Sequence, residues 1–331
     1  MKKVKVIIKI LTLTLLWLSI TITQASDLNV ENVNDKLSKK NIEQAINNVI
    51  VILKKEYVYP QKSLLIEEGF KHKLATNELD DISDWYSFIR SINAIMRNVS
   101  GDMYLDIVET SHLLTLEKAQ EKSELDNKDS LGVHSAEILS GNVGYMKLNH
   151  FYQNPEVEIE IYRTLNELSN VDALIIDLRD SEGDSISLAL YLMSFFVQEN
   201  TILSEVLYEK QEKIKILRSF ENTGSDKFKH NFPIYILTSS FLSSSGEFFS
   251  YTLKHLKKAV IVGEETMGVA YILKKQKIND YISINIPIAI PLHPITHTNW
   301  EKTGVIPDVD TNASLSLSTA HKMAKKHLGV F

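Results

Sequence analysis

Apolar residues recur at helical spacing in the first part of the chain, beginning at Asn41. A stretch with this spacing is expected to form a helix that buries one face. Pro60 disfavours helical geometry at Tyr59, so the helix is expected to end there. The pattern predicts two further helices, over 63–75 and 82–96. Residues 27–109 are therefore predicted to form a small helical N-terminal domain.

Residues 110–130 are rich in polar and charged residues. A run of mixed charge of this kind usually lies in solvent, so we predict a connector here and assign it no function. From Leu131 onward the pattern changes to strands alternating with helices. Strands are predicted over 143–148, 173–178, 233–238, 259–263 and 281–290, and helices over 156–169, 187–197, 246–257 and 321–327.

This alternation is typical of a layered α/β domain in which helices cover a sheet. The stretch 173–178 is almost continuously apolar, as expected of a strand that is buried on both faces. Residues 131–331 are therefore predicted to form one α/β domain.

The first 26 residues differ from the rest of the chain. Four Lys residues precede an apolar stretch over 10–22, and Ala25 follows it. This layout predicts a signal peptide over 1–25, cleaved after Ala25. The apolar stretch is shorter than the roughly 20 residues that span a bilayer, which favours cleavage over a retained anchor. We expect secretion across the inner membrane, a periplasmic location and no membrane span after cleavage.

Charge and composition exclude several classes of function. The formal net charge is −6, and loss of the four Lys residues of the signal peptide lowers it to about −10. An acidic surface argues against nucleic acid as a partner. The chain has no Cys, which excludes thiolate catalysis and thiolate metal sites. No metal-ligand spacing, phosphate loop or dinucleotide fingerprint is present, so no cofactor is expected.

A Ser-rich turn, 243–245, lies between the predicted strand 233–238 and the helix that follows it. A hydroxyl at this place lies near unpaired backbone N–H groups, which can stabilise an oxyanion during acyl transfer. The same position also suits a Ser that only caps the helix. The local pattern leaves both interpretations open.

The turn resembles the nucleophile loop of the tail-specific, or C-terminal processing, serine protease family. In that family a Ser precedes a Glu by three residues, as Ser244 precedes Glu247 here. Other segments resemble family motifs in the same order along the chain: Asp177-Leu178-Arg179 before a turn with Gly183, Val262-Gly263-Glu264 before Thr266-Met267-Gly268, and Asn299-Trp300-Glu301 before Gly304-Val305-Ile306-Pro307-Asp308.

The helical N-terminal domain, with Tyr57-Val58-Tyr59-Pro60, is similar to the branch that includes interphotoreceptor retinoid-binding protein modules and the tricorn protease core. No stretch resembles a PDZ domain. The resemblance implies a crotonase-like β/α layered core. It also implies an exported serine peptidase that works through an acyl-enzyme, with a peptide or protein substrate lying between the helical and α/β domains.

The resemblance also implies roles for individual residues. Ser244 stands at the nucleophile position, and the backbone N–H groups of Gly183 and Ser245 at the positions that hold the oxyanion. Glu301 stands where a carboxylate orients the catalytic base. Independently of the resemblance, we expect a structural role for Asp177 and Arg179 at the strand end, either in pairing with each other or in fixing the turn.

Three positions depart from the family pattern. Tyr104 stands where one branch has its catalytic His, Val269 where the other has a Lys, and Asp184 where the turn has a second Gly. Tyrosine is a poor base because its ordinary pKa is near 10. Another His could substitute, with His297 as the first candidate and His112 as the second. An inactive relative that binds a peptide or an apolar ligand in the same cleft, or a scaffolding protein of the cell envelope, remains an alternative.

Overall fold

The computed structural model describes residues 37–110, 132–209, 212–221 and 226–330. The predicted signal peptide, most of the predicted connector and His112 lie outside the described residues. Within the described part of the chain, no helix is both long enough and apolar enough to cross a membrane.

Three helices form the N-terminal region, as the sequence predicted, with shifted bounds: α2 (Lys39–Glu56), α3 (Pro60–Ala75) and α4 (Trp85–Ser100). α2 ends before Pro60, as predicted. Pro60 itself begins α3, because proline is tolerated in the first turn of a helix. The Asp84 side chain caps α4 by accepting a hydrogen bond from the Ser87 N–H at 2.8 Å. The cap explains why α4 begins later than the apolar spacing indicated.

The larger sheet has six strands in the order β11-β8-β7-β4-β3-β2. Neighbouring strands run parallel from β3 to β11, whereas β2 pairs antiparallel with β3. The strands are β2 (Val133–Leu139), β3 (Val143–Leu148), β4 (Ala173–Asp177), β7 (Ile234–Thr238), β8 (Val260–Gly263) and β11 (Val309–Asp310). The carboxyl ends of the parallel strands therefore lie along one edge of the sheet.

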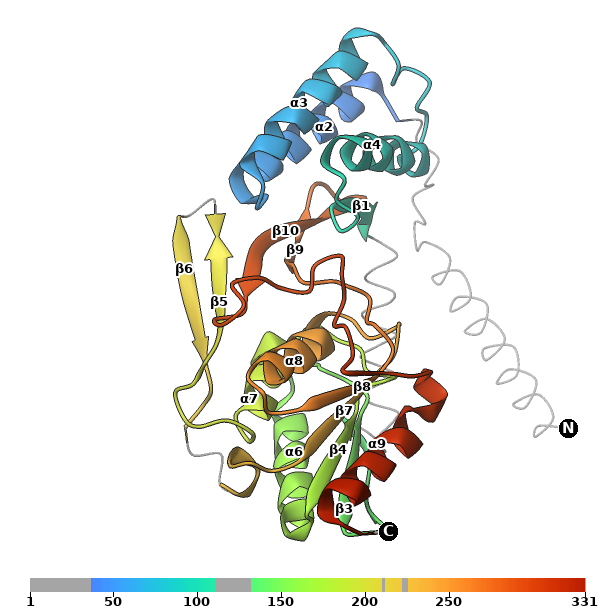
Figure 1. The fold of residues 1–331 in the computed structure, drawn as a ribbon. Coiled ribbons are helices and arrows are strands. Elements are labelled where there is room, and N and C mark those ends of the chain that lie inside the picture. Colours follow the sequence, from blue (N-terminus) through green and yellow to red (C-terminus); the bar gives the residue numbers. More distant parts are fainter. Residues whose placement is uncertain (1–36, 111–131, 210–211, 222–225, 331) are drawn as a thin grey trace, which may run out of the picture.

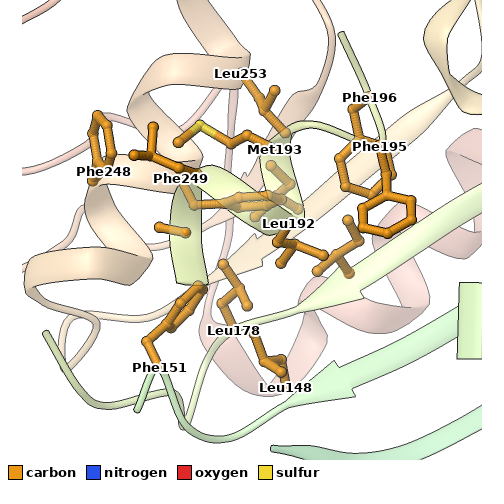
Figure 2. Packing of buried hydrophobic residues seen from close by; sticks show 14 of the residues in the cluster. Leu148, Phe151, Leu178, Leu192, Met193, Phe195, Phe196, Phe248, Phe249 and Leu253 are labelled. Atoms are coloured by element: carbon orange, nitrogen blue, oxygen red, sulfur yellow. The ribbon is translucent and has the colours of Figure 1, made fainter. Parts of the chain in front are cut away.

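Helices cover both faces of this sheet, which confirms the predicted layered α/β fold. Leu174 and Ile176 of β4 pack with one set of helices, and Ala173 and Ile175 point to the other face under α9, because neighbouring strand residues face opposite ways. The helices are α6 (Pro155–Glu167), the one-turn η1 (Leu168–Asn170), α7 (Ile186–Met193), α8 (Ser244–His255) and α9 (Ala313–Leu328). Figure 2 shows buried hydrophobic residues packed around α7 and α8.

A second sheet follows the order β1-β10-β5-β6, and β9 also pairs with β10. Its strands are β1 (Asp106–Glu109), β5 (Ile202–Tyr208), β6 (Lys213–Arg218), β9 (Ile272–Lys277) and β10 (Ile282–Leu292), and the short η3 (Lys227–Lys229) precedes β7. This sheet lies between the N-terminal helices and the six-stranded sheet (Figure 1). Of these strands the sequence pattern predicted only β10.

The N-terminal helices do not have a core of their own. Ile46 and Phe88 belong to the same buried cluster as Ile107 of β1 and Ile284 of β10. The Val58 N–H also donates a hydrogen bond to the Pro287 carbonyl at 2.9 Å. The helical region is therefore joined to the rest of the molecule through the second sheet.

Candidate active site

Ser244 is the first residue of α8 and follows a short loop from the carboxyl end of β7. Its backbone has φ +52°, in the left-handed region that side chains other than glycine rarely adopt. Such a conformation costs about 1–3 kcal/mol and persists only where surrounding contacts hold it. The Ser243 side chain makes no capping hydrogen bond, so the turn must be held by other groups.

Glu247, one turn into α8, holds this turn in place. Its carboxylate is fully buried and accepts a hydrogen bond from the Ser244 N–H at 3.0 Å. It also accepts from the Thr266 hydroxyl at 2.5 Å and from the backbone N–H groups of Gly268 and Val269 at 2.6 and 2.8 Å. Burial raises the pKa of Glu247 despite these bonds. Glu247 thus ties the Ser244 turn to the loop that follows β8.

Two residues near Ser244 have backbone N–H groups that make no backbone hydrogen bond to another described residue. Gly183 and Ser245 both line the cavity that contains Ser244, and neither N–H donates a hydrogen bond to another described residue. Gly183 has φ +108°, and a Cβ there would lie 2.7 Å from the Phe151 carbonyl oxygen. Only glycine fits this turn. The two residues predicted to hold an oxyanion are thus brought together with the predicted nucleophile.

The cavity beside Ser244 has a volume of about 380 Å³. Its walls are mostly apolar and come from the second sheet, from α7 and α8, and from loops: Ile186, Val206, Leu217, Phe248, Val269, Ala270, Ile272, Leu273, Pro291 and Trp300. Among the described residues, the N-terminal helices contribute nothing to this lining. All of the lining residues belong to 131–331, the predicted α/β domain, and the position of a substrate between this domain and the helical one stays a prediction.

Tyr104 lies between α4 and β1 and does not line this cavity. Its hydroxyl donates a long hydrogen bond of 3.4 Å to the Gly268 carbonyl. Burial raises the pKa of Tyr104 to about 12, and the nearby carboxylates of Glu301 and Glu247 act in the same direction. A hydroxyl with this pKa stays protonated at neutral pH, so Tyr104 cannot take a proton from Ser244.

Glu301 lies in the loop after β10, where the sequence predicted an orienting carboxylate. Its Oε2 atom accepts a hydrogen bond from the Ala270 N–H at 3.0 Å, whereas Oε1 is buried and has no hydrogen-bond partner among the described residues. Burial raises the pKa of Glu301, and the Ala270 bond opposes it. The carboxylate is held beside the cavity wall with one oxygen free for a base that Tyr104 does not supply.

Tyrosine side chains connect the N-terminal helices to the cavity wall, a feature that the sequence analysis missed. The hydroxyl groups of Tyr59 and Tyr271 lie 2.6 Å apart, and Tyr271 lines the cavity. The Tyr57 hydroxyl donates to Asp102 at 2.9 Å, and the other Asp102 oxygen accepts from the Tyr104 N–H at 2.9 Å. Isolated tyrosines give no sequence signal, so only the fold could reveal this cluster.

Among the described residues, no histidine lines the cavity beside Ser244, and His112 lies outside them. His297 is exposed, and neither it nor the buried His293 lines the cavity. Burial lowers the pKa of His293 to about 4, and its Nδ1 atom accepts a hydrogen bond from the Ile295 N–H at 3.2 Å. Among the described residues, no side chain hydrogen-bonds the Ser244 hydroxyl, and no three His, Asp or Glu residues form a metal site.

Asp177 and Arg179 have the expected structural role. The Arg179 guanidinium donates to the two Asp177 carboxylate oxygens at 2.8 and 2.6 Å, and the Tyr145 hydroxyl donates to the same carboxylate at 2.7 Å. This ion pair stabilises the carboxyl end of β4, from which the chain runs towards Gly183.

Trp300 forms part of the cavity wall beside Val269, the position of the family Lys. Its indole N–H donates to the Val269 carbonyl at 3.1 Å, and its ring stacks on Phe248 with the ring centroids 5.9 Å apart. At Val269 the cavity therefore presents a packed apolar surface in place of an amine.

Residues 142–311 match the family described as Peptidase family S41. The chain is 28% identical to carboxyl-terminal-processing peptidase 2, chloroplastic, of Arabidopsis thaliana over 170 residues, which are 51% of this chain and 32% of that protein. It is 26% identical to a carboxyl-terminal-processing protease of Picosynechococcus over 168 residues, which are 50% of this chain and 38% of that protein. The chain thus spans about a third of the length of these relatives.

Two solved structures share the fold. A photosystem II D1 C-terminal processing protease superposes with a TM-score of 0.61 at 15% identity, covering 83% of this chain and 94% of that one. A lipoprotein from Streptococcus agalactiae superposes with a TM-score of 0.61 at 16% identity, covering 86% of this chain and 96% of that one. At these identities the likeness concerns the fold alone.

Proposed function

The chain belongs to peptidase family S41, and we propose that it is a serine peptidase in which Ser244 is the nucleophile. One observation carries the proposal. Ser244 is held at φ +52° beside a cavity that Gly183 and Ser245 also line, and the N–H groups of these two residues make no backbone hydrogen bond to another described residue. A strained nucleophile beside two unpaired donors is the arrangement that acyl transfer needs.

In the proposed reaction the Ser244 hydroxyl oxygen attacks the carbonyl carbon of a peptide bond. The carbonyl oxygen gains negative charge and is held by the N–H groups of Gly183 and Ser245, at the positive end of α8. Collapse of the intermediate breaks the C–N bond and expels the amine, whose nitrogen takes up the proton that the Ser244 hydroxyl loses. Water then hydrolyses the ester on Ser244, releasing the acid and restoring the hydroxyl. Glu247 contributes by fixing the Ser244 backbone.

The proton of the Ser244 hydroxyl has no acceptor among the described side chains, since Tyr104 is protonated and His297 lies away from the cavity. General-base catalysis is worth about 10²–10⁴ in rate. We therefore expect hydrolysis slower by roughly this factor than in a relative that has a His at the Tyr104 position.

A fluorophosphonate probe tests the nucleophile, because it reacts with an activated serine in an oxyanion site. The protein from residue 26 onward should be labelled, Ser244→Ala should not, and Ser240→Ala should be labelled normally. Ser240 is a suitable control because it is an exposed serine in the same loop. Absence of labelling under conditions that label an active family member contradicts the peptidase proposal.

The second candidate function is an inactive family member that binds a peptide or an apolar ligand. The observation in its favour is Tyr104, whose pKa of about 12 and bond to Gly268 fit a structural role. This candidate predicts saturable binding of apolar peptides with no Ser244-dependent turnover. Hydrolysis that Ser244→Ala abolishes excludes it.

We also propose export to the periplasm, on the basic and apolar pattern of residues 1–25. Fractionation of a producing bacterium, with mass determination of the mature N-terminus, tests both points. Full-length protein that stays in the cytoplasm contradicts the proposal.

A further inference from the structure

Asp184 is the one charged side chain among the described residues that line the Ser244 cavity. It follows Gly183 directly and is exposed. None of the ion pairs between described residues involves it. Asp184 is therefore an exposed residue in an otherwise uncharged cavity lining, and it has no ion-pair partner among the described residues.

The rest of the lining cannot balance this charge. The walls are formed by aliphatic and aromatic side chains, with serine, tyrosine and backbone groups as the polar contributions. An apolar wall excludes water on one side of the carboxylate, which strengthens its interaction with a charge placed nearby. A cationic group of a ligand is attracted to this position, and an anionic group is repelled.

The position of Asp184 has a chemical consequence. The Gly183 N–H is the proposed donor to the oxyanion, and a carboxylate one residue away raises the energy of that developing negative charge. A substrate ammonium or guanidinium group that pairs with Asp184 offsets the repulsion between this carboxylate and the oxyanion. The departure from glycine at this position is then compatible with hydrolysis of one class of substrate.

We propose that this cavity selects peptides in which a Lys or Arg lies next to a large aliphatic or aromatic residue. The apolar side chain occupies the cavity between Phe248, Val206 and Ile272, and the cation pairs with Asp184. The inference rests on the proposed function in taking a peptide as the ligand. It requires binding and not turnover.

Equilibrium binding to the Ser244→Ala variant tests this selection without depending on hydrolysis. The ligands are fluorescent peptides with blocked termini that carry Leu or Phe beside Lys, Gln or Glu, placed before or after the apolar residue. Pairing with an exposed carboxylate predicts that Lys peptides bind about threefold more tightly than Gln peptides and about tenfold more tightly than Glu peptides. The difference should shrink in about 1 M salt, where the screening length is about 3 Å.

The variant Asp184→Asn, made in the Ser244→Ala background, should remove the difference between the peptides. Asp172→Asn is the matched control, because it changes net charge equally but lies before β4, at the opposite end of the strand. The Lys preference should survive in this control. Equal affinities for all peptides, a preference that persists in Asp184→Asn, or no binding of any peptide overturns the proposal.

The binding result separates this proposal from the peptidase proposal. A Lys preference that depends on Asp184, in a protein whose unmodified form hydrolyses nothing, upholds the selection and contradicts the peptidase activity. Ser244-dependent hydrolysis with no preference for Lys over Glu upholds the peptidase activity and contradicts the selection by Asp184. Thermal unfolding of each variant establishes that the fold is retained.

Discussion

The Glu247 carboxylate accepts a hydrogen bond from the backbone N–H of Ser244 at 3.0 Å, one helical turn away. The same buried carboxylate holds Thr266, Gly268 and Val269. A single side chain therefore fixes both the left-handed turn at the proposed nucleophile and the neighbouring wall of the cavity. The stability of the Ser244 turn and the reactivity of Ser244 should both depend on the hydrogen bonds to Glu247.

Replacing Glu247 by Gln places an amide N–H₂ among partners that are all donors. At least one of them loses its acceptor, which should lower the free energy of unfolding by about 2–4 kcal/mol. Labelling of Ser244 by a fluorophosphonate should fall as the turn relaxes. Urea unfolding and labelling rate check the two effects. Unchanged stability would show that the network contributes little.

Gly183→Ala should destabilise the protein by about 1–3 kcal/mol, because φ +108° is unfavourable for Ala and its Cβ would meet the Phe151 backbone. Gly101→Ala is the matched control. Gly101 also has a positive φ, of +63°, but nothing lies within 4 Å of the added Cβ. Gly101→Ala should lower the free energy of unfolding by about 1 kcal/mol, because only the left-handed backbone conformation is unfavourable for Ala there. Equal losses in thermal unfolding would contradict the close approach at Gly183.

Tyr104→His should raise hydrolysis of a peptide substrate by about 10²-fold or more, since it places an imidazole where the family has its base. Glu301 Oε1, which is buried without a partner, is available to accept from that imidazole. Tyr104→Phe is the control. It removes only the long hydrogen bond to the Gly268 carbonyl. It should therefore lower the free energy of unfolding by about 0.5 kcal/mol and leave turnover unchanged. Equal rates for the two variants would argue against a base position at residue 104.

Glu301 should make the protein less stable as pH rises through weakly acidic values. Burial raises the pKa of Glu301 above its ordinary value of 4.5, so its favourable contribution is complete below that value and is lost as pH rises through the folded-state pKa. Glu301→Gln should therefore gain stability relative to the unmodified protein between pH 4 and neutrality. Thermal unfolding of both proteins across this range measures the difference, and parallel curves would refute it.

Asp177, in contrast to Glu301, should make the protein less stable as pH falls. Burial favours its neutral form, but the bonds from Arg179 and Tyr145 outweigh burial and lower its pKa below the ordinary 3.8. Its contribution is present above that value and is lost as pH falls through the folded-state pKa. Asp177→Asn should cost about 3 kcal/mol near neutral pH, because it leaves Arg179 without a charged partner. The loss should shrink in strong acid, as urea unfolding at several pH values can measure.

Periodicity along the chain predicted most of the helices and several of the buried strands, although it missed β5 and covered only part of α9. The spacing from Ile42 to Leu53 predicted α2, and the apolar stretch 173–178 predicted β4, because burial of a face leaves a local pattern. The order of short motifs also identified Ser244 at the start of a helix. These features depend on residues close together in the sequence.

β6 and β9, which the sequence did not reveal, have no continuous stretch of buried residues. β6 is exposed along most of its length, and β9 alternates between half-buried and exposed residues. They form strands because β5 and β10 offer paired backbone groups to them. The second sheet they help to build contributes Leu217, Ile272 and Leu273 to the cavity wall, which is why that wall could not be predicted.

The sequence by itself predicted family positions for Ser244, Gly183 and Glu301, and it showed that Tyr104 does not carry a basic side chain. Only the tertiary structure decided what each of them contacts. Gly183 opens into the cavity beside Ser244 because the Phe151 backbone packs against it, and Tyr104 meets Gly268, a residue 164 positions later. Contacts between segments so far apart depend on how helices and sheets pack together, and no local pattern encodes that packing.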